Sequence, residues 1–251
     1  MRIRRHPSHE RPWTLEHVLL PHVVVEDRLV HIHNVRDFTF RSSDDFTPGY
    51  RDQTYDLELL ERVWLVLAPF RRNWRGPAHI FLSFGFSDGH YLSISVEARR
   101  KAGRPFSLLK GALRRFELIY VIGEERDLIG LRALWDTPLY LYPMRATPGQ
   151  VQGVFLHMLR RAQALEQQPA FYNTFTNNCT TNILDAVNTI AAKPIPFGLK
   201  LLLPGYADAL AHERGLVDTE LPLGAARTRF QVNERAKAAL GSPDFSERIR
   251  S

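Results

Sequence analysis

Residues 78–97 read AHIFLSFGFSDGHYLSISVE, and this stretch decides the fold. Ser87, Asp88 and Gly89 form a turn signal whose glycine can take the left-handed position, so the flanking segments are predicted to pair as a β-hairpin. Pairing about that turn places His79 across from Glu97. The even-numbered positions are almost all apolar and are expected to face the core. The odd-numbered positions carry mainly polar groups, and that face is expected to meet water or to line a site.

The segments around this hairpin predict one α+β domain over residues 1–251. Alternating or continuous apolar residues predict β-structure at 24–35, 57–69, 116–122 and 139–143. Polar or irregular segments are expected to be a lead-in at 1–20, loops at 36–56 and 98–112, and a frayed polar tail at 225–251.

Two longer helices are predicted in the second half of the chain, followed after Leu201 by a turn and a short helix. Thr147 and Pro148 supply a capping hydroxyl and a proline at the first helical position, and apolar residues then recur at helical spacing to about Gln167. A second helix is expected to begin at Asn178 or Cys179 and to end before Pro194. The first of these helices is amphipathic.

Composition narrows the classes of function. The chain has 251 residues, of which 44% are hydrophobic, so a sizeable core is expected. Its net charge of +6 favours anionic surroundings, but the basic residues occur in scattered pairs without a nucleic-acid motif. Nucleic acid is therefore not expected, and anionic lipid headgroups of a membrane surface are the preferred partner for a basic face. The oligomeric state is left open.

Membrane insertion is not indicated by hydropathy. The first residues lack the uninterrupted apolar core of a signal peptide, and no apolar run reaches the ~18 residues of a membrane span. The chain is expected to be soluble, either as it stands or as part of a longer product that carries an anchor.

A single cysteine, Cys179, excludes an internal disulfide and a cysteine-rich metal site. It lies at the predicted helix start in FYNTFTNNCTTNI, residues 171–183. The positive end of a helix dipole stabilises a thiolate, which favours a catalytic nucleophile. The alternative is a small buried filler, but the surrounding polar residues are unusual for an apolar pocket.

His79 is the candidate base among ten histidines, because Glu97 across the hairpin could orient its ring. A register shift of one residue would leave Ser95 as the alternative orienter. A purely structural role for His79 is the competing interpretation. Catalytic candidates are therefore Cys179, His79 and Glu97.

Other site candidates follow from the helix start and the polar hairpin face. Backbone amides at that start, with Asn177 and Asn178 as oxyanion or capping candidates, could stabilise a tetrahedral intermediate. Site-lining candidates are Ser83, Ser95 and Tyr172. No HExxH motif, phosphate-binding glycine loop or GxSxG elbow occurs, and the HIH at 31–33 is a lone histidine pair, so no metal or cofactor is predicted.

Several ordered blocks resemble the Lnb N-terminal periplasmic domain family over about residues 12–222. The blocks are VHIHNVRDFTFRSSDDFTPGYRDQTYDLELL, AHIFLSFGFSDGHYLSISVEAR, FELIYVIGEERDLIGLR, LYLYPMRATP and FYNTFTNNCTTNI. The family is similar to circularly permuted papain-like enzymes, such as lecithin retinol acyltransferases and NlpC-type peptidases, in which the histidine strand precedes the cysteine helix. The resemblance implies an antiparallel sheet packed against helices, and a Cys and His active site at Cys179 and His79.

The name-giving member of that family is a lipoprotein N-acyltransferase. The resemblance therefore implies a lipid or lipoprotein substrate and a periplasmic, membrane-associated location in a bacterium. That enzyme has membrane spans and relatives usually carry an N-terminal hydrophobic anchor, and this sequence shows neither, which keeps a cytoplasmic location open.

Three functional hypotheses follow. The first is a thiol-dependent acyltransferase or hydrolase that forms an acyl-enzyme on Cys179. The second is a cell-wall or peptide amidase that uses the same cysteine and histidine. The third, from another class, is a non-catalytic binding module at a membrane surface, in which Cys179 serves packing alone.

Overall fold

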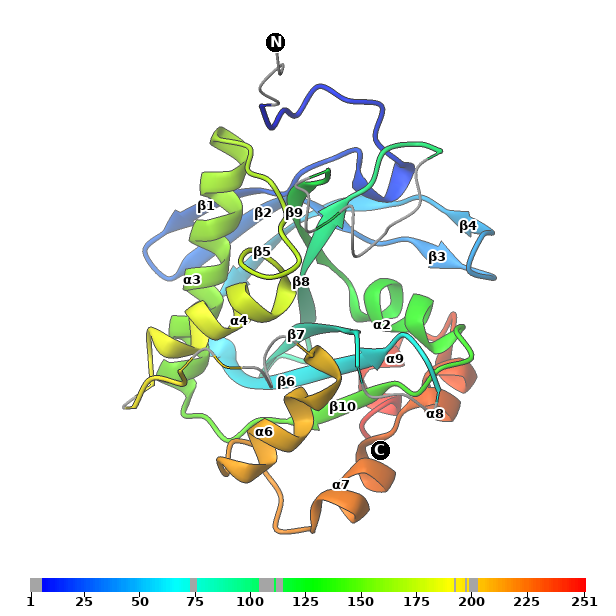
Figure 1. The fold of residues 1–251 in the computed structure, drawn as a ribbon, viewed down its shortest axis with the longest axis vertical. Helices are drawn as coiled ribbons and strands as arrows, with labels where there is room; N and C mark the ends of the chain where they lie inside the picture. The colour runs from blue at the N-terminus through cyan, green and yellow to red at the C-terminus, as the bar shows by residue number, and fades with distance from the viewer. Residues whose placement is uncertain are drawn as a thin grey trace.

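The computed structural model describes residues 6–72, 76–103, 111, 115–191, 193–196, 198 and 203–251. Within these residues, the main feature is an eight-stranded sheet in the order β1-β2-β9-β8-β7-β6-β10, in which β5 also pairs with β2 (Figure 1). The strands of this sheet are β1 (His22–Glu26), β2 (Leu29–Arg36), β5 (Tyr50–Asp56), β6 (Leu60–Pro69), β7 (Ala78–Phe86), β8 (Tyr91–Arg99), β9 (Glu117–Gly123) and β10 (Tyr140–Pro143). The short strands β3 (Thr39–Phe40) and β4 (Phe46–Thr47) form a separate pair.

The predicted hairpin of β7 and β8 is confirmed, and its register is the predicted one from Gly85–Tyr91 to Leu82–Ile94. Gly89 takes the left-handed conformation in the turn, with φ of 87°. The ladder ends at Leu82–Ile94, although β8 continues to pair with β9 as far as Arg99. The two strands therefore diverge before they reach His79.

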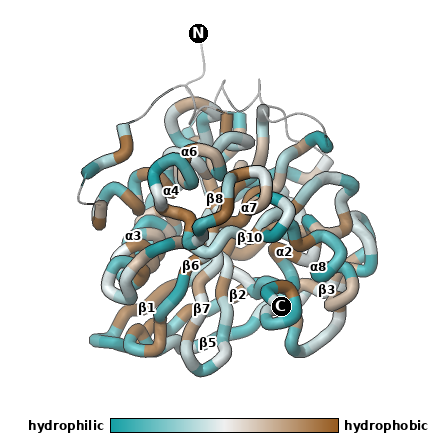
Figure 2. Tube along the Cα trace, turned by 90° about the horizontal axis from the view of Figure 1, so that it is seen from below, coloured by the Kyte–Doolittle hydropathy of each residue, from teal (hydrophilic) through white to brown (hydrophobic). Residues whose placement is uncertain are grey.

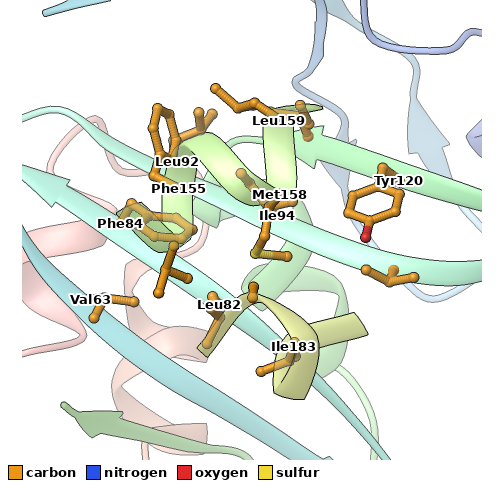
Figure 3. Packing of buried hydrophobic residues seen from close by; sticks show 14 of the residues in the cluster. Val63, Leu82, Phe84, Leu92, Ile94, Tyr120, Phe155, Met158, Leu159 and Ile183 are labelled. Carbon is orange, nitrogen blue, oxygen red and sulfur yellow. The ribbon is translucent and has the colours of Figure 1, made fainter. Parts of the chain in front are cut away.

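Helices cover both faces of the sheet (Figure 1). On one face α3 (Pro148–Gln167) and α4 (Cys179–Asn188) pack on the even-numbered side chains of the hairpin, and Figure 3 shows Phe155, Met158 and Ile183 among them. On the other face lie α2 (Glu125–Ala133), α8 (Asn233–Ala239) and α9 (Phe245–Arg248). The odd-numbered face of the hairpin, expected to be open to water or a site, is therefore largely buried by these helices.

Both longer predicted helices are confirmed, and their starts follow from capping. Thr147 and Gln150 form a reciprocal capping box at the start of α3. The Asn178 side chain accepts a hydrogen bond from the backbone N–H of Thr181 and caps α4. Capping thus makes Cys179 the first helical residue.

The sheet is mixed, so the expectation of a purely antiparallel sheet is wrong, while the α+β class is confirmed. β2 and β9 run parallel and share a single pair, Arg36–Gly123. Beside this pair the Glu124 amide donates to the Arg36 carbonyl at 2.8 Å, and the Arg36 guanidinium donates to both Asp127 oxygens of α2 at 2.8 and 2.7 Å. A Cβ on Gly123 would lie 2.8 Å from the Arg36 carbonyl oxygen, so this close approach requires glycine.

Two expectations for irregular segments, those for residues 36–56 and 225–251, are wrong. Residues 36–56, expected as a loop, contain β3, β4 and β5. Residues 225–251, expected to fray, contain α8, α9 and most of α7 (Leu223–Phe230), because small and aromatic residues of this tail are buried against α2. The lead-in includes a 3₁₀ turn, η1 (Leu15–His17), whose His17 is buried. Residues 104–110 and 112 of the expected 98–112 loop lie outside the described residues.

The remaining elements are short. They are η2 (Leu57–Leu59), η3 (Pro204–Tyr206) and α6 (Ala207–Glu213). The trace coloured by hydropathy shows hydrophobic segments on several sides of the molecule rather than in one band (Figure 2). Among the described residues, no helix combines the length and hydropathy needed to cross a membrane.

Candidate active site

A cleft of about 570 Å³ holds most of the candidate residues. It lies beside the region where β7 and β8 diverge and where α4 begins. His79, Glu97, Asn178, Cys179 and Tyr172 line it. The rest of the lining is mainly apolar and includes Phe70, Leu131, Trp135, Phe175 and Leu203.

Cys179 occupies the first position of α4 and is 6% exposed. Burial raises the pKa of its thiol. The hydrogen bond and charge of His79 and the backbone N–H of Ile80 lower that pKa by more, so the pKa of Cys179 lies below its ordinary value. The Ile80 amide is available because β8 has diverged from β7 at this point. The end of the ladder thus supplies a donor to the sulfur.

His79 lies between the Cys179 thiol and an acidic relay, which is formed by Ser95 and Glu97. Its Nε2 lies 2.7 Å from Ser95 Oγ, and the Ser95 hydroxyl donates to Glu97 Oε1 at 2.7 Å. Because the Ser95 proton is directed at Glu97, Oγ accepts from His79 Nε2–H. Burial lowers the pKa of His79, but hydrogen bonds with Cys179 and Glu97 raise it to a net value above the ordinary one.

Glu97 is fixed as an anion by surrounding donors. Burial raises the pKa of Glu97, but Arg132, His17 and His79 hold it well below its usual range. Arg132 donates to Oε1 at 2.8 Å. His17 Nε2 lies 3.3 Å from Oε2, and its Nδ1 accepts from the Arg100 amide, so Nε2 carries the proton. Burial lowers the pKa of His17, which favours this neutral tautomer.

Arg132 and His17 were not among the sequence candidates. Arg132 lies on α2, a helix that the sequence reasoning did not predict, and His17 lies in the segment expected to be irregular. The sequence signal for the helix that carries Arg132 was the run EERDLIGLR after a predicted strand. Acidic residues in a first turn and a basic residue in a last turn are typical of a helix. His17 had no local signal, because its partner lies 80 residues away in the chain.

Two sequence candidates lie elsewhere. Ser83 donates to Glu125, which also receives the Arg250 guanidinium at 2.6 Å, in a buried cluster on the same hairpin face as His79 but outside the cleft. Asn177 donates to the Phe171 carbonyl and accepts from Asn182, and it does not line the cleft. Asn178 acts as the cap of α4, and Ser95 hydrogen-bonds His79 directly.

Among the described ranges, no group of three or more His, Cys, Asp or Glu side chains is arranged to hold a metal ion.

Residues 46–205, more than half of the chain, match the family model described as the Lnb N-terminal periplasmic domain. The chain belongs to this family. The Lnb N-terminal match contains His79, Ser95, Glu97, Arg132 and Cys179, and it excludes His17 and the C-terminal helices. The family description supports a periplasmic domain. Neither the curated proteins nor the solved structures include a match.

Proposed function

We propose that the protein is a thiol-dependent acyltransferase or hydrolase that forms an acyl-enzyme on Cys179 and acts on lipid or lipoprotein acyl groups. The observation that carries this proposal is that the Cys179 thiol, at the start of α4, and the His79 imidazole line one mainly apolar cleft, where each shifts the pKa of the other. A packing cysteine needs neither a buried histidine partner nor an acidic relay behind it. The histidine strand precedes the cysteine helix, which supports a circularly permuted papain-like arrangement.

The first step forms the acyl-enzyme. His79 Nε2 is engaged by Ser95, so Nδ1 is the nitrogen left to take the thiol proton. The thiolate attacks the acyl carbonyl, and the bond to the leaving group breaks as His79 returns the proton to that group. The Cys179 amide is one of the first N–H groups of α4 and is the natural donor to the oxyanion.

The second step transfers the acyl group. An amine or a water molecule gives a proton to His79 and attacks the thioester, which restores the free thiol. Glu97 stays anionic during both steps and stabilises the imidazolium that forms each time.

The lining supports an acyl chain as the bound part of the substrate. Phe70, Phe175 and Leu203 line the cleft and are 41%, 53% and 41% exposed. Exposed aromatic and aliphatic side chains around a cleft are typical of sites that take up apolar ligands. A sugar and peptide substrate would be expected to meet more polar groups, which places the amidase second.

The test compares native protein with Cys179→Ala, His79→Ala and the control His90→Ala, whose histidine is exposed and pairs with Asp88. A thiol-reactive acyl probe should label the native protein and His90→Ala rapidly at neutral pH, His79→Ala slowly and Cys179→Ala not at all. A binding module without catalysis would label equally with and without His79, and that result would overturn the proposal.

The substrate class needs a second measurement. Native protein should release or transfer acyl chains from phospholipid or diacylated lipopeptide, and Cys179→Ala should not. Release of peptide fragments from peptidoglycan, without acyl turnover, would identify the amidase instead.

A further inference from the structure

A second cavity, of about 450 Å³, lies on the other side of the first turn of α4. On α4, Thr180 lines this cavity and Cys179 lines the cleft. On β7, Ile80 lines this cavity and His79 lines the cleft. The Thr180 hydroxyl lies 4.0 Å from the Cys179 sulfur. The second cavity is therefore separate from the reactive pair but one residue behind it.

The wall of this cavity is apolar. Side chains of β6, β7, α3, α4 and α6 form it, including Leu65, Leu82, Val154, Ile183 and Leu210. Figure 2 shows α4 and α6 as neighbours at one side of the molecule. The volume falls in the lower part of the range for ligand pockets, about 300–1,000 Å³, which favours one alkyl chain over two.

Among the described residues, the charged side chains that line the cavity are all basic, and no Asp or Glu lines it. They are Arg145, Lys193 and Arg214. Arg145 is paired with Asp218 and Glu220. Lys193 and Arg214 are exposed, and neither has an ion-pair partner within the described part of the chain. An apolar wall with unpaired cations and no acidic group matches an amphiphile with a negative head.

We propose that the cavity between α3, α4 and α6 binds a single-chain lipid with an anionic head group. The alkyl chain lies along Val154 and Ile183, and the head group pairs with Lys193 and Arg214. No bond is made or broken in this site, and the proposal does not depend on the chemistry of Cys179. Its position against Thr180 gives a bound lipid direct contact with the turn that holds the thiol.

The experiment uses the full chain carrying Cys179→Ala, so that turnover cannot contribute and a failure of the proposed function leaves the result unaffected. Calorimetry compares palmitate and palmitoyl lysophosphatidylglycerol with palmitoyl glycerol, which has the same chain and no charge. The two anionic lipids should each bind at least about tenfold more tightly than the neutral one, since charge-assisted contacts are the stronger hydrogen bonds.

Variants then assign the site. Lys193→Gln with Arg214→Gln should weaken both anionic lipids about tenfold or more and leave palmitoyl glycerol unchanged. The matched control Lys237→Gln removes a charge from α8, on the opposite face, and should change nothing. Val187→Trp and Ala191→Trp each place a large ring in the cavity and should block binding of all three lipids. The circular dichroism spectra and melting temperatures of both variants should remain native-like.

Three results would overturn the proposal. The first is equal affinity for anionic and neutral lipids. The second is an affinity for the anionic lipids that does not change when Lys193 and Arg214 are replaced by Gln. The third is the absence of lipid binding, which would leave the cavity to an apolar peptide segment.

Discussion

Glu97 is the residue on which the electrostatics of the cleft depend, because it hydrogen-bonds Ser95, His17 and Arg132 and its Oε1 lies 3.6 Å from His79 Nε2. Its depressed pKa also has a consequence for folding. A carboxylate whose pKa is lower in the folded state stabilises the protein above its unfolded pKa, about 4.3. That contribution is lost as the pH falls below this value through the lower folded pKa.

Glu97→Gln should move the pH profile of Cys179 alkylation to higher pH. Glu97 raises the pKa of His79, so its loss lowers that pKa and leaves less imidazolium to stabilise the thiolate. The pKa of the thiol should rise in consequence. Iodoacetamide rates measured from pH 5 to 10 check this, and an unshifted midpoint would remove Glu97 from the electrostatics of the pair.

Arg132→Gln should destabilise the protein by about 3–5 kcal/mol in urea unfolding at neutral pH, since it leaves Glu97 buried without its cation. Adding Glu97→Gln to Arg132→Gln should recover part of this loss, because the unpaired charge is then gone. An additive double variant would mean that Arg132 acts through its packing on Phe81, at 4.9 Å, rather than through the ion pair.

At the scale of elements, the best predictions came from segments whose local signals agree. α3 has a capping residue, a proline and regular apolar spacing, and its observed bounds match. The turn at Gly89 and strict alternation set the hairpin register. α2 was missed because it begins directly after β9 and only part of its surface is apolar, so its burial depends on packing with the distant α8.

The caps of α3 and α4 offer a matched comparison. Asn178→Ala and Thr147→Ala each remove an N-cap with a reciprocal capping box and should each cost about 1 kcal/mol in thermal or urea unfolding. Only Asn178→Ala should also slow Cys179 alkylation at neutral pH, because fraying of α4 weakens the field at the thiol. Equal alkylation rates in both variants would show that His79 alone sets thiol reactivity.

The stability of the whole molecule depends on the C-terminal segment 225–251, which the sequence pattern had indicated to be frayed. Phe245 is 2% exposed and packs in the cluster under α2. Phe245→Ala should therefore cost about 3–5 kcal/mol. The control Phe175→Ala removes a 53% exposed ring and should stay within about 0.5 kcal/mol. A similar small effect for Phe245→Ala would mean that the tail adds little to the cooperative fold.

The parts of the candidate site that could be predicted are those whose signals lie in neighbouring residues of the sequence. A cysteine at a capped helix start and a histidine near a hairpin end can be read from neighbouring residues, and the structure brings both into one cleft. The serine between His79 and Glu97 depends on where β7 and β8 separate, which alternation does not encode. Arg132 and His17 come from elements whose positions are set by tertiary packing, so no window of sequence contains their relation to Glu97.

The single parallel pair between β2 and β9 divides the sheet into two panels. The smaller panel, with β1, β2 and β5, is joined to the larger by shared core packing and by the Arg36–Asp127 ion pair to α2, instead of a long amide ladder. The turn bearing His17 is anchored to both panels, since Arg36 of β2 donates to the Glu16 carbonyl and Arg99 of β8 donates to the carbonyls of His17 and Val18. A small rotation along this joint would therefore strain a turn held at both sides and alter the donor that His17 offers to Glu97.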